Sequence, residues 1–394
     1  MDRRSVPLAP RRRSVRRRIL AVLAALLVVA VAVWAFVVRP REPAIAFLNR
    51  LAGPAPTWDD LAKAGARLPV EPRPPTVVRP VARADAPRVV AVAGVTPEGV
   101  RDPRVLRVVE ALAAAGCDVV APELAGLARP GEDETLVDDV VVAWRRALAG
   151  DGGTSGPRRR VAFLGVSLGA GVVLRALARG AEGDPAPATV AAVLLVGPPD
   201  DTVALARAWF RRAVAPADAK GLDEARSDAG LFARHGVARA AAARLLPAAE
   251  LAPVRAWLDA VGETPSSGHR EPAGLASPEA ARFVASVKAE DRVADDDLAW
   301  LLAAATPFLE ASSPAAAPSL ARVAAPVFVV HGVEDALVPV TEARALAARL
   351  TASSAVEVLE SRLLSHVDVA SPGLAETWRH VTFVQRFLDA AGAP

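Results

Sequence analysis

The residues best suited to chemistry lie in one short segment, 165–169, with the sequence Gly-Val-Ser-Leu-Gly. It follows the apolar run 161–164 and leads directly into an apolar, helix-forming stretch. This order predicts a strand, a sharp turn and a helix, with Ser167 at the tip. Glycines two positions before and after the serine relieve the crowding of so tight a turn. The segment therefore predicts a nucleophilic serine, and a serine that only caps the helix is the alternative.

A serine hydroxyl needs a base within hydrogen-bond reach, and the base needs a third group to orient it. Two later loops contain suitable residues. Asp335 lies in the string His-Gly-Val-Glu-Asp-Ala-Leu-Val-Pro, which follows an apolar run, and His366 lies in the string Ser-His-Val-Asp. Both are predicted to follow strands, and the loops at the carboxyl ends of parallel strands converge. We therefore expect Asp335 and His366 to meet Ser167.

Rivals exist for both partners. Asp200 or Asp201, after another apolar run, could supply the carboxylate instead of Asp335. His380 could be the base, although the pattern around it predicts a helix rather than a loop. The remaining histidines are interpreted as structural (His331) or solvated (His235 and His269).

The elements that must position these residues alternate along the chain. Short Val-rich runs predict six buried strands near 89–93, 118–121, 161–165, 190–196, 326–330 and 355–359. Amphipathic stretches predict helices near 103–116, 135–149, 168–179, 341–350 and 374–391. Such alternation predicts an α/β fold with a mostly parallel sheet covered by helices on both faces. The Ala-rich interval 202–322 interrupts it, and we expect an all-helical cap inserted between the core halves 88–201 and 323–394.

The N-terminal region has a different character. The first 18 residues include eight Arg and form a basic arm, whereas 19–38 has no charged residue and is long enough for a transmembrane helix. Arginine on the N-terminal flank predicts a single-pass membrane anchor with a cytoplasmic N-terminus and an extracytoplasmic catalytic domain. Export after cleavage of a signal peptide is the alternative. The Pro-rich interval 39–87 is predicted to be a linker. Its amphipathic stretch 45–61 is expected to pack on the domain or to lie on the membrane.

The chain resembles the α/β-hydrolase superfamily over about 88–200 and 325–394. The resemblance rests on the Gly-x-Ser-x-Gly turn, the His-Gly-x-x-Asp-x-x-Val-Pro string, and the chain order Ser167, Asp335, His366. It implies that Ser167 attacks an acyl carbonyl, His366 transfers the proton and Asp335 orients the imidazole. It also implies an oxyanion hole formed by the N–H groups of Val95 and Leu168.

The sequence departs from this family in two places. Many relatives have His-Gly where this chain has Ala93 and Gly94. The antiparallel strand pair that usually opens the fold is hard to find before residue 88, and at most 77–81 is a remnant of it.

Composition excludes some classes of function. The arm contributes +7 to a formal charge of +3, so the rest of the chain is net negative and a nucleic-acid surface is not expected. Cys and His residues lack metal-ligand spacing, and we expect no metal and no cofactor. Cys117, the only cysteine, opens an apolar segment and is predicted to be a buried structural thiol.

Two functions follow from these observations. The first is a membrane-anchored serine hydrolase that cleaves a small-molecule carboxylic ester or thioester through an acyl-enzyme intermediate. The second is a catalytically inactive binding or scaffold module at the membrane with the same fold.

Overall fold

The structure is a computed structural model of the 394-residue chain. It describes residues 34–69, 74–83, 85–96, 98–150, 160–180, 185–211, 223–263, 271–289, 292–317, 320–362, 364 and 374–393.

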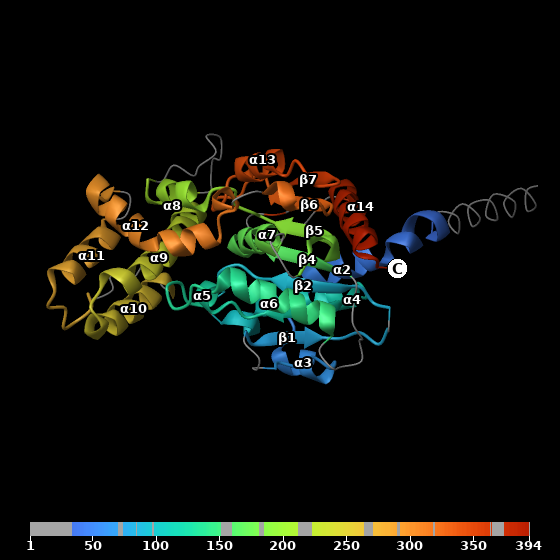
Figure 1. The fold of residues 1–394 in the computed structure, drawn as a ribbon, viewed down its shortest axis with the longest axis horizontal. Helices are drawn as coiled ribbons and strands as arrows, with labels where there is room; N and C mark the ends of the chain where they lie inside the picture. Colours follow the sequence, from blue (N-terminus) through green and yellow to red (C-terminus); the bar gives the residue numbers. More distant parts are fainter. Residues whose placement is uncertain are drawn as a thin grey trace, which may run out of the picture.

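The described residues form a seven-stranded sheet at the centre of the molecule (Figure 1). Its strands are β1 (Thr76–Arg79), β2 (Arg88–Val92), β3 (Asp118–Pro122), β4 (Val161–Val166), β5 (Val190–Val196), β6 (Val327–Gly332) and β7 (Val356–Ser361). Their order is β1-β3-β2-β4-β5-β6-β7, and only the β1–β3 pair is antiparallel. The predicted α/β class and parallel sheet are confirmed.

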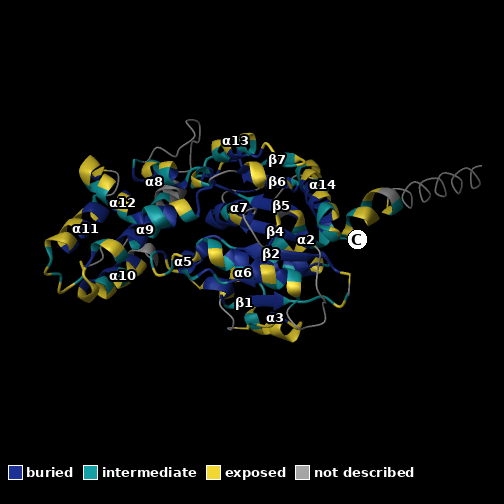
Figure 2. Cartoon of the chain, in the orientation of Figure 1, coloured by how far each residue is buried: buried dark blue, intermediate teal, exposed yellow. Residues whose placement is uncertain are grey.

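Alternation along the strands gives the sheet two buried faces. In β2, Val90 and Val92 belong to one apolar cluster and Val89 and Ala91 to the other. The first face is covered by α6 (Leu136–Ala149), α7 (Leu168–Gly180) and α13 (Val340–Arg349), and the second by α2 (Glu42–Ala52), α4 (Pro103–Ala114) and α14 (Leu374–Ala391). Figure 2 shows the inner strands buried between these layers, whereas the edge strand β7 is partly exposed. Burial on both faces explains their Val-rich composition.

Helices fill the described part of the interval between β5 and β6. They are α8 (Thr202–Phe210), α9 (Asp223–Leu245), α10 (Ala248–Glu263), α11 (Pro278–Lys288) and α12 (Asp295–Ala311), followed by the short helices η6 (Pro314–Ala316) and η7 (Leu320–Arg322). Helices α8 to α12 lie together at one end of the molecule, beyond α5 (Ala125–Ala128) (Figure 1), whereas η6 and η7 pack against α7. The Trp209 indole N–H donates to the Leu337 carbonyl at 2.7 Å, which connects α8 to the loop after β6.

The interval 39–87, expected to be a linker, is instead largely folded onto the core. It contains α2, α3 (Trp58–Lys63) and the edge strand β1, which overlaps the expected 77–81 remnant but begins one residue earlier and ends before Pro80. Helix α2 packs on α4 and α14, and its Ala44 N–H donates to the Gln385 side chain at 3.3 Å. Pro43 stands in the first turn of α2, where a missing N–H costs nothing, so proline content did not exclude a helix.

Most of the predicted membrane anchor, 19–38, and the whole arm 1–18 lie outside the described residues. The described end of that stretch, Trp34–Val38, is a short helix, η1, followed by a 3-10 turn, Arg39–Arg41. Within the residues that the structure describes, no helix has both the length and the apolar character needed to cross a membrane.

The remaining short helices are η3 (Gly99–Arg101) and η4 (Pro187–Thr189). Cys117 is fully buried just before β3, as predicted, and burial raises the pKa of its thiol to about 12. A thiol so protected from ionisation is unreactive, which fits a structural role.

Candidate active site

Ser167 occupies a strained position in the turn between β4 and α7. Its φ is +52°, and among the described residues it is the one non-glycine residue with positive φ. A non-glycine residue in this region costs on the order of 1–3 kcal/mol, so neighbouring structure must hold it. The Ser167 N–H donates to the Val196 carbonyl at 2.8 Å, and the Ala170 N–H donates to the Ser167 carbonyl at 2.9 Å. Backbone strain maintained in this way is typical of functional sites.

The glycines around Ser167 are required by close approach of the backbone. A Cβ on Gly165 would lie 2.6 Å from the Ala170 Cα, and one on Gly169 would lie 2.1 Å from the Ala93 carbonyl oxygen. Neither position can accept a side chain without movement of the main chain. The spacing noted in the sequence therefore has the steric cause expected of a strand–turn–helix elbow.

Ser167 lines a cavity of about 480 Å³, a size typical of small-molecule sites. The cap contributes Trp209, Phe232 and Phe308 to its wall, and α2 contributes Phe47 and Leu51. The amphipathic pattern of 45–61 predicted that this segment packs on the domain or lies on the membrane, but it did not predict that α2 lines the cavity.

Two backbone donors lie at the same cavity. Val95, three residues after β2, and Leu168, the first residue of α7, both line it with Ser167. Neither N–H has a hydrogen-bond partner within the described part of the chain. The Leu168 N–H also belongs to a helix N-terminus, where the partial positive charge favours an anion. These donors could stabilise negative charge on an atom bound at Ser167.

Asp335 lies directly behind the cavity wall in the loop after β6, and it is 1% exposed. Its Oδ1 accepts hydrogen bonds from the N–H groups of Leu337 and Val338, both at 2.8 Å, and these two residues line the cavity. Its Oδ2 lies 3.4 Å from His331 Nε2. Because His331 Nε2 is also 2.8 Å from the Val338 carbonyl, we assign the ring proton to that nitrogen. His331 is fully buried and supports this loop, as its structural interpretation predicted.

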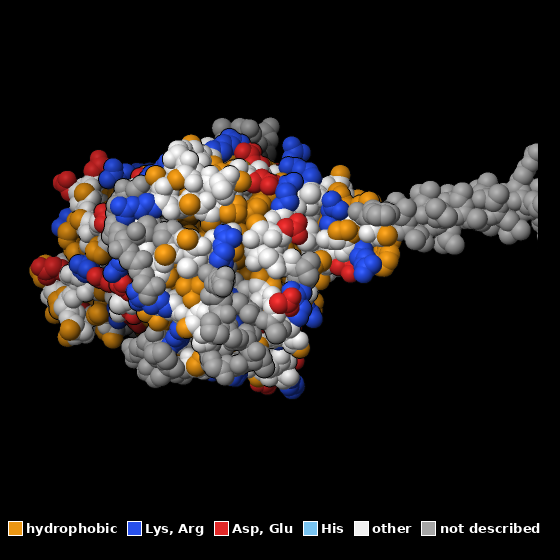
Figure 3. Space-filling view, turned by 45° about the vertical axis from the view of Figure 1, so that its right-hand side comes forward, with side chains coloured by type: hydrophobic (Ala, Val, Ile, Leu, Met, Phe, Trp, Pro, Cys, Tyr) orange, Lys and Arg blue, Asp and Glu red, His pale blue; other side chains and the backbone are white. Residues whose placement is uncertain are grey.

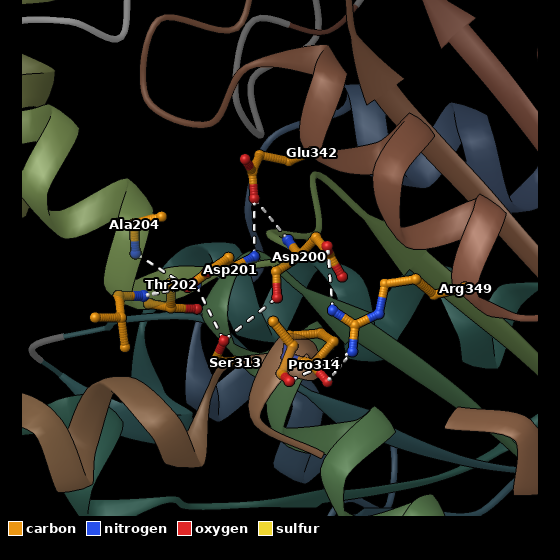
Figure 4. Close-up of polar contacts among 10 residues, drawn as sticks. Asp200, Asp201, Thr202, Ala204, Ser313, Pro314, Glu342 and Arg349 are labelled. Carbon is orange, nitrogen blue, oxygen red and sulfur yellow. Dashed lines mark hydrogen bonds and ion pairs between the residues drawn. The ribbon is translucent and has the colours of Figure 1, made fainter. Parts of the chain in front are cut away.

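The rival carboxylates after β5 are used elsewhere (Figure 4). Asp201 caps α8, accepting from the N–H groups of Val203 and Ala204, both at 3.0 Å. Asp200 Oδ2 lies 3.5 Å from an Arg349 nitrogen. Burial raises the pKa of the Asp200 carboxyl, and the guanidinium of Arg349 opposes this. Neither aspartate lines the cavity around Ser167.

His380, the rival base, does line the cavity, but both of its ring nitrogens are engaged. Its Nδ1 is 2.8 Å from the Glu376 carbonyl one turn earlier in α14, so that nitrogen carries the proton. Its Nε2 is 2.9 Å from the Ser361 hydroxyl, which therefore donates to it. These contacts fit a structural histidine that connects α14 to β7.

His366 lies outside the described residues, so the structure does not test its place in the site. Leu364, two residues before it, lines the cavity, as do Thr377 and His380 on α14, which follows it. His269 also lies outside the described residues. His235, expected to be solvated, is 7% exposed, because α9 is enclosed by α8, α10, α11 and α12.

The described residues contain no group of three or more His, Cys, Asp or Glu side chains that could hold a metal ion.

No protein-family model and no curated protein matches the sequence. Solved structures with a similar arrangement include a membrane phospholipase A described as a bacterial virulence factor, at 18% identity and a TM-score of 0.43, with 96% of this chain and 100% of that chain covered. Mouse alpha/beta hydrolase domain-containing protein 10 is similar at 15% identity and a TM-score of 0.41, with 83% of this chain and 99% of that chain covered. A Rhodococcus 2-hydroxy-6-oxo-6-phenylhexa-2,4-dienoate hydrolase is similar at 18% identity and a TM-score of 0.39, with 81% of this chain and 94% of that chain covered.

The strand order and the strained serine elbow between β4 and α7 together decide the fold. The chain has the α/β-hydrolase fold. Similarity at the level of these neighbours does not extend to substrate or activity. Within this fold, Ser167 lies in the elbow between β4 and α7, and Asp335 lies in the loop after β6.

Proposed function

We propose that the protein is a serine hydrolase that cleaves a carboxylic ester or thioester through an acyl-enzyme intermediate. The observation that carries the proposal is Ser167 itself, held at positive φ beside an apolar cavity that also contains two backbone donors without partners in the described part of the chain. Strain at a serine, with anion-stabilising N–H groups next to it, is the arrangement that acyl transfer requires.

In the proposed reaction, His366 removes the proton from the Ser167 hydroxyl as its oxygen attacks the acyl carbonyl. The N–H groups of Val95 and Leu168 stabilise the resulting oxyanion. The intermediate collapses to an acyl-serine, and His366 returns the proton to the departing alcohol or thiol. Water, activated by the same imidazole, then releases the acid.

Asp335 would orient the imidazole and stabilise its positive charge during both steps. Its role is supported by the two N–H donors that bind its Oδ1, because they hold the carboxylate in one orientation at the cavity wall. His366 is supported by chain length: it follows Leu364, a cavity residue, by two positions, and two residues span at most about 7 Å.

Reaction with a fluorophosphonate tests the proposal. The purified wild-type chain should be labelled covalently, and Ser167→Ala should not be labelled although it unfolds at a similar temperature. Ser155→Ala, in a segment without catalytic assignment, serves as the matched serine control and should be labelled like the wild type. Folded wild-type protein that neither reacts with the probe nor hydrolyses esters would instead indicate the inactive binding module.

We also propose that residues 19–38 anchor the protein in a membrane, with 1–18 in the cytoplasm and the hydrolase domain outside it. Two exposed tryptophans support this: Trp34, where the described chain begins, is 51% exposed, and Trp378, on α14 close to Arg41, is 37% exposed. The guanidinium of Arg41 lies 5.4 Å from the Trp378 ring centre. Tryptophan with arginine is common at membrane interfaces.

Alkaline extraction of the membrane fraction tests the anchor. The full chain should stay with the membranes, and a variant with Leu26→Arg and Val29→Arg should be released. A soluble wild-type protein whose N-terminal sequence begins beyond residue 38 would indicate export with signal cleavage instead.

A further inference from the structure

The cavity at Ser167 extends well beyond the strand ends. Ala91, Leu164 and Leu194 all line it, and they are neighbours in register across β2, β4 and β5. Their side chains belong to the apolar cluster on the α2, α4 and α14 face of the sheet. Leu164 precedes Ser167 by three residues, so the cavity continues for about 10 Å along the sheet from the serine.

Helices α2 and α14 form the other wall of this extension. Phe47, Leu48 and Leu51 line it from α2, and Phe383 and Val384 line it from α14. Phe47 is 5% exposed, and Phe383 is 1% exposed. A helix that comes from outside the alternating core thus encloses a space on the sheet face without filling it.

The chemistry of the wall restricts what can occupy this space. No described lining residue is an aspartate or a glutamate, and the arginines among them, Arg104 and Arg107, both come from α4. Arg104 is already paired with Asp102 through two hydrogen bonds of 2.9 and 2.7 Å. A cationic group has no counter-charge here, whereas an uncharged hydrocarbon chain meets apolar side chains along the sheet.

The end of α2 marks an opening of the cavity. Asn49 and Ala52 line the cavity and are exposed at the surface. Hydrophobic side chains gather near the middle of the face drawn in Figure 3, with charged side chains around them. Because Asn49 and Ala52 are exposed where they line the cavity, an apolar molecule can enter beside α2.

We propose that the substrate carries a long alkyl chain, which lies along the sheet beneath α2 with its carbonyl at Ser167. This inference rests on the proposed function for the position of the carbonyl. A short acyl group would leave the apolar space beneath α2 unfilled and would forgo the burial of each additional methylene. The expected substrates are long-chain acyl esters or thioesters.

The test compares hydrolysis of p-nitrophenyl palmitate and p-nitrophenyl butyrate by the purified full chain. In the wild type, kcat/KM should be higher for palmitate. Ala91→Leu adds bulk at the far end of the cavity, and Ala52→Trp adds bulk at its opening. Each should lower the palmitate-to-butyrate ratio by at least about tenfold, the effect of a few lost methylene contacts. Arg50→Trp adds the same side chain to an exposed position on α2 that does not line the cavity, and its ratio should equal that of the wild type.

A wild-type preference for butyrate, or equal ratios in Ala52→Trp and Arg50→Trp, would overturn the inference. If Ala91→Leu does not fold, Ala52→Trp decides, because its position is exposed. If the protein hydrolyses neither ester, the proposed function fails, and the proposed site for the alkyl chain is tested by ligand binding alone. Ser167→Ala should then bind the fluorescent fatty acid cis-parinaric acid, and adding Ala52→Trp should weaken binding by about tenfold or more. Equal affinity for cis-parinaric acid in Ser167→Ala with and without Ala52→Trp would overturn the proposed site for the alkyl chain.

Discussion

Asp335 and Asp200 occupy comparable positions at the carboxyl ends of the neighbouring strands β6 and β5, but their surroundings differ. Asp335 has one oxygen fixed by two N–H groups of cavity-lining residues. Asp200 faces Arg349, has an Oδ1 with no partner among the described residues, and its own N–H donates to Glu342 Oε2 at 2.8 Å. In the proposed mechanism the first carboxylate orients the base, whereas the second lies in the junction between the sheet and the cap. Position at a strand end is therefore not enough to assign a catalytic acid.

The junction around Asp200 connects three separate parts of the chain. The Ser313 hydroxyl and the Ala315 N–H both donate to the Asp200 carbonyl, at 3.3 and 2.9 Å (Figure 4). The Thr202 hydroxyl donates to the Ser312 carbonyl at 3.0 Å. These bonds hold the beginning and the end of the cap together next to α13. The main-chain carbonyls of Asp200 and Ser312 thus fix the base of the cap.

The largest expected effect separates the two aspartates by activity. Asp335→Asn keeps an oxygen that accepts from Leu337 and Val338 but removes the charge that stabilises an imidazolium, so kcat should fall by about 10⁴-fold. Asp200→Asn should change kcat by no more than a few-fold. Steady-state ester hydrolysis measures both. Equal losses in the two variants would remove the distinction between them.

A smaller effect on stability should come from the cap junction. Glu342 Oε2 accepts from the N–H groups of Asp200 and Asp201 at 2.8 and 3.0 Å. Glu342→Ala leaves these N–H groups without that acceptor, which should lower the free energy of unfolding by about 1–3 kcal/mol. Urea denaturation measures it. Arg344→Ala, on the same helix, removes only an exposed ion pair with Glu360 and should have little effect. A similar loss in both variants would argue against a specific junction.

The smallest effect is a pH dependence. The pKa of Asp200 is raised in the folded state, so the native protein binds a proton more tightly than the unfolded chain does. This carboxyl therefore makes the protein less stable as the pH rises from its ordinary pKa of 3.8 through the raised value. The amide introduced by Asp200→Asn does not titrate. The free energy of unfolding of this variant, relative to wild type, should thus increase across that window, and a decrease would reverse the assigned direction.

Much of the core could be predicted because its determinants are local. Val-rich runs indicated the parallel strands. The glycines at 165 and 169 indicated the elbow, because neighbouring main-chain atoms leave no room for a Cβ at either position. The choice between Asp335 and Asp200 was open because it depends on Arg349, which is distant in sequence. Residues 39–87 were predicted to be a linker for a similar reason: the amphipathic pattern of 45–61 allowed packing on the domain, but its partners α4 and α14 are distant in sequence.

The central claim is that Ser167, His366 and Asp335 form one proton-transfer unit. A crystal structure of the fluorophosphonate adduct tests it most directly. We predict phosphorus bonded to Ser167 Oγ, a phosphonyl oxygen about 3 Å from the N–H groups of Val95 and Leu168, and the His366 ring between Ser167 and Asp335 Oδ2. An adduct on another residue, or a His366 ring beyond hydrogen-bond reach of both partners, would contradict the account.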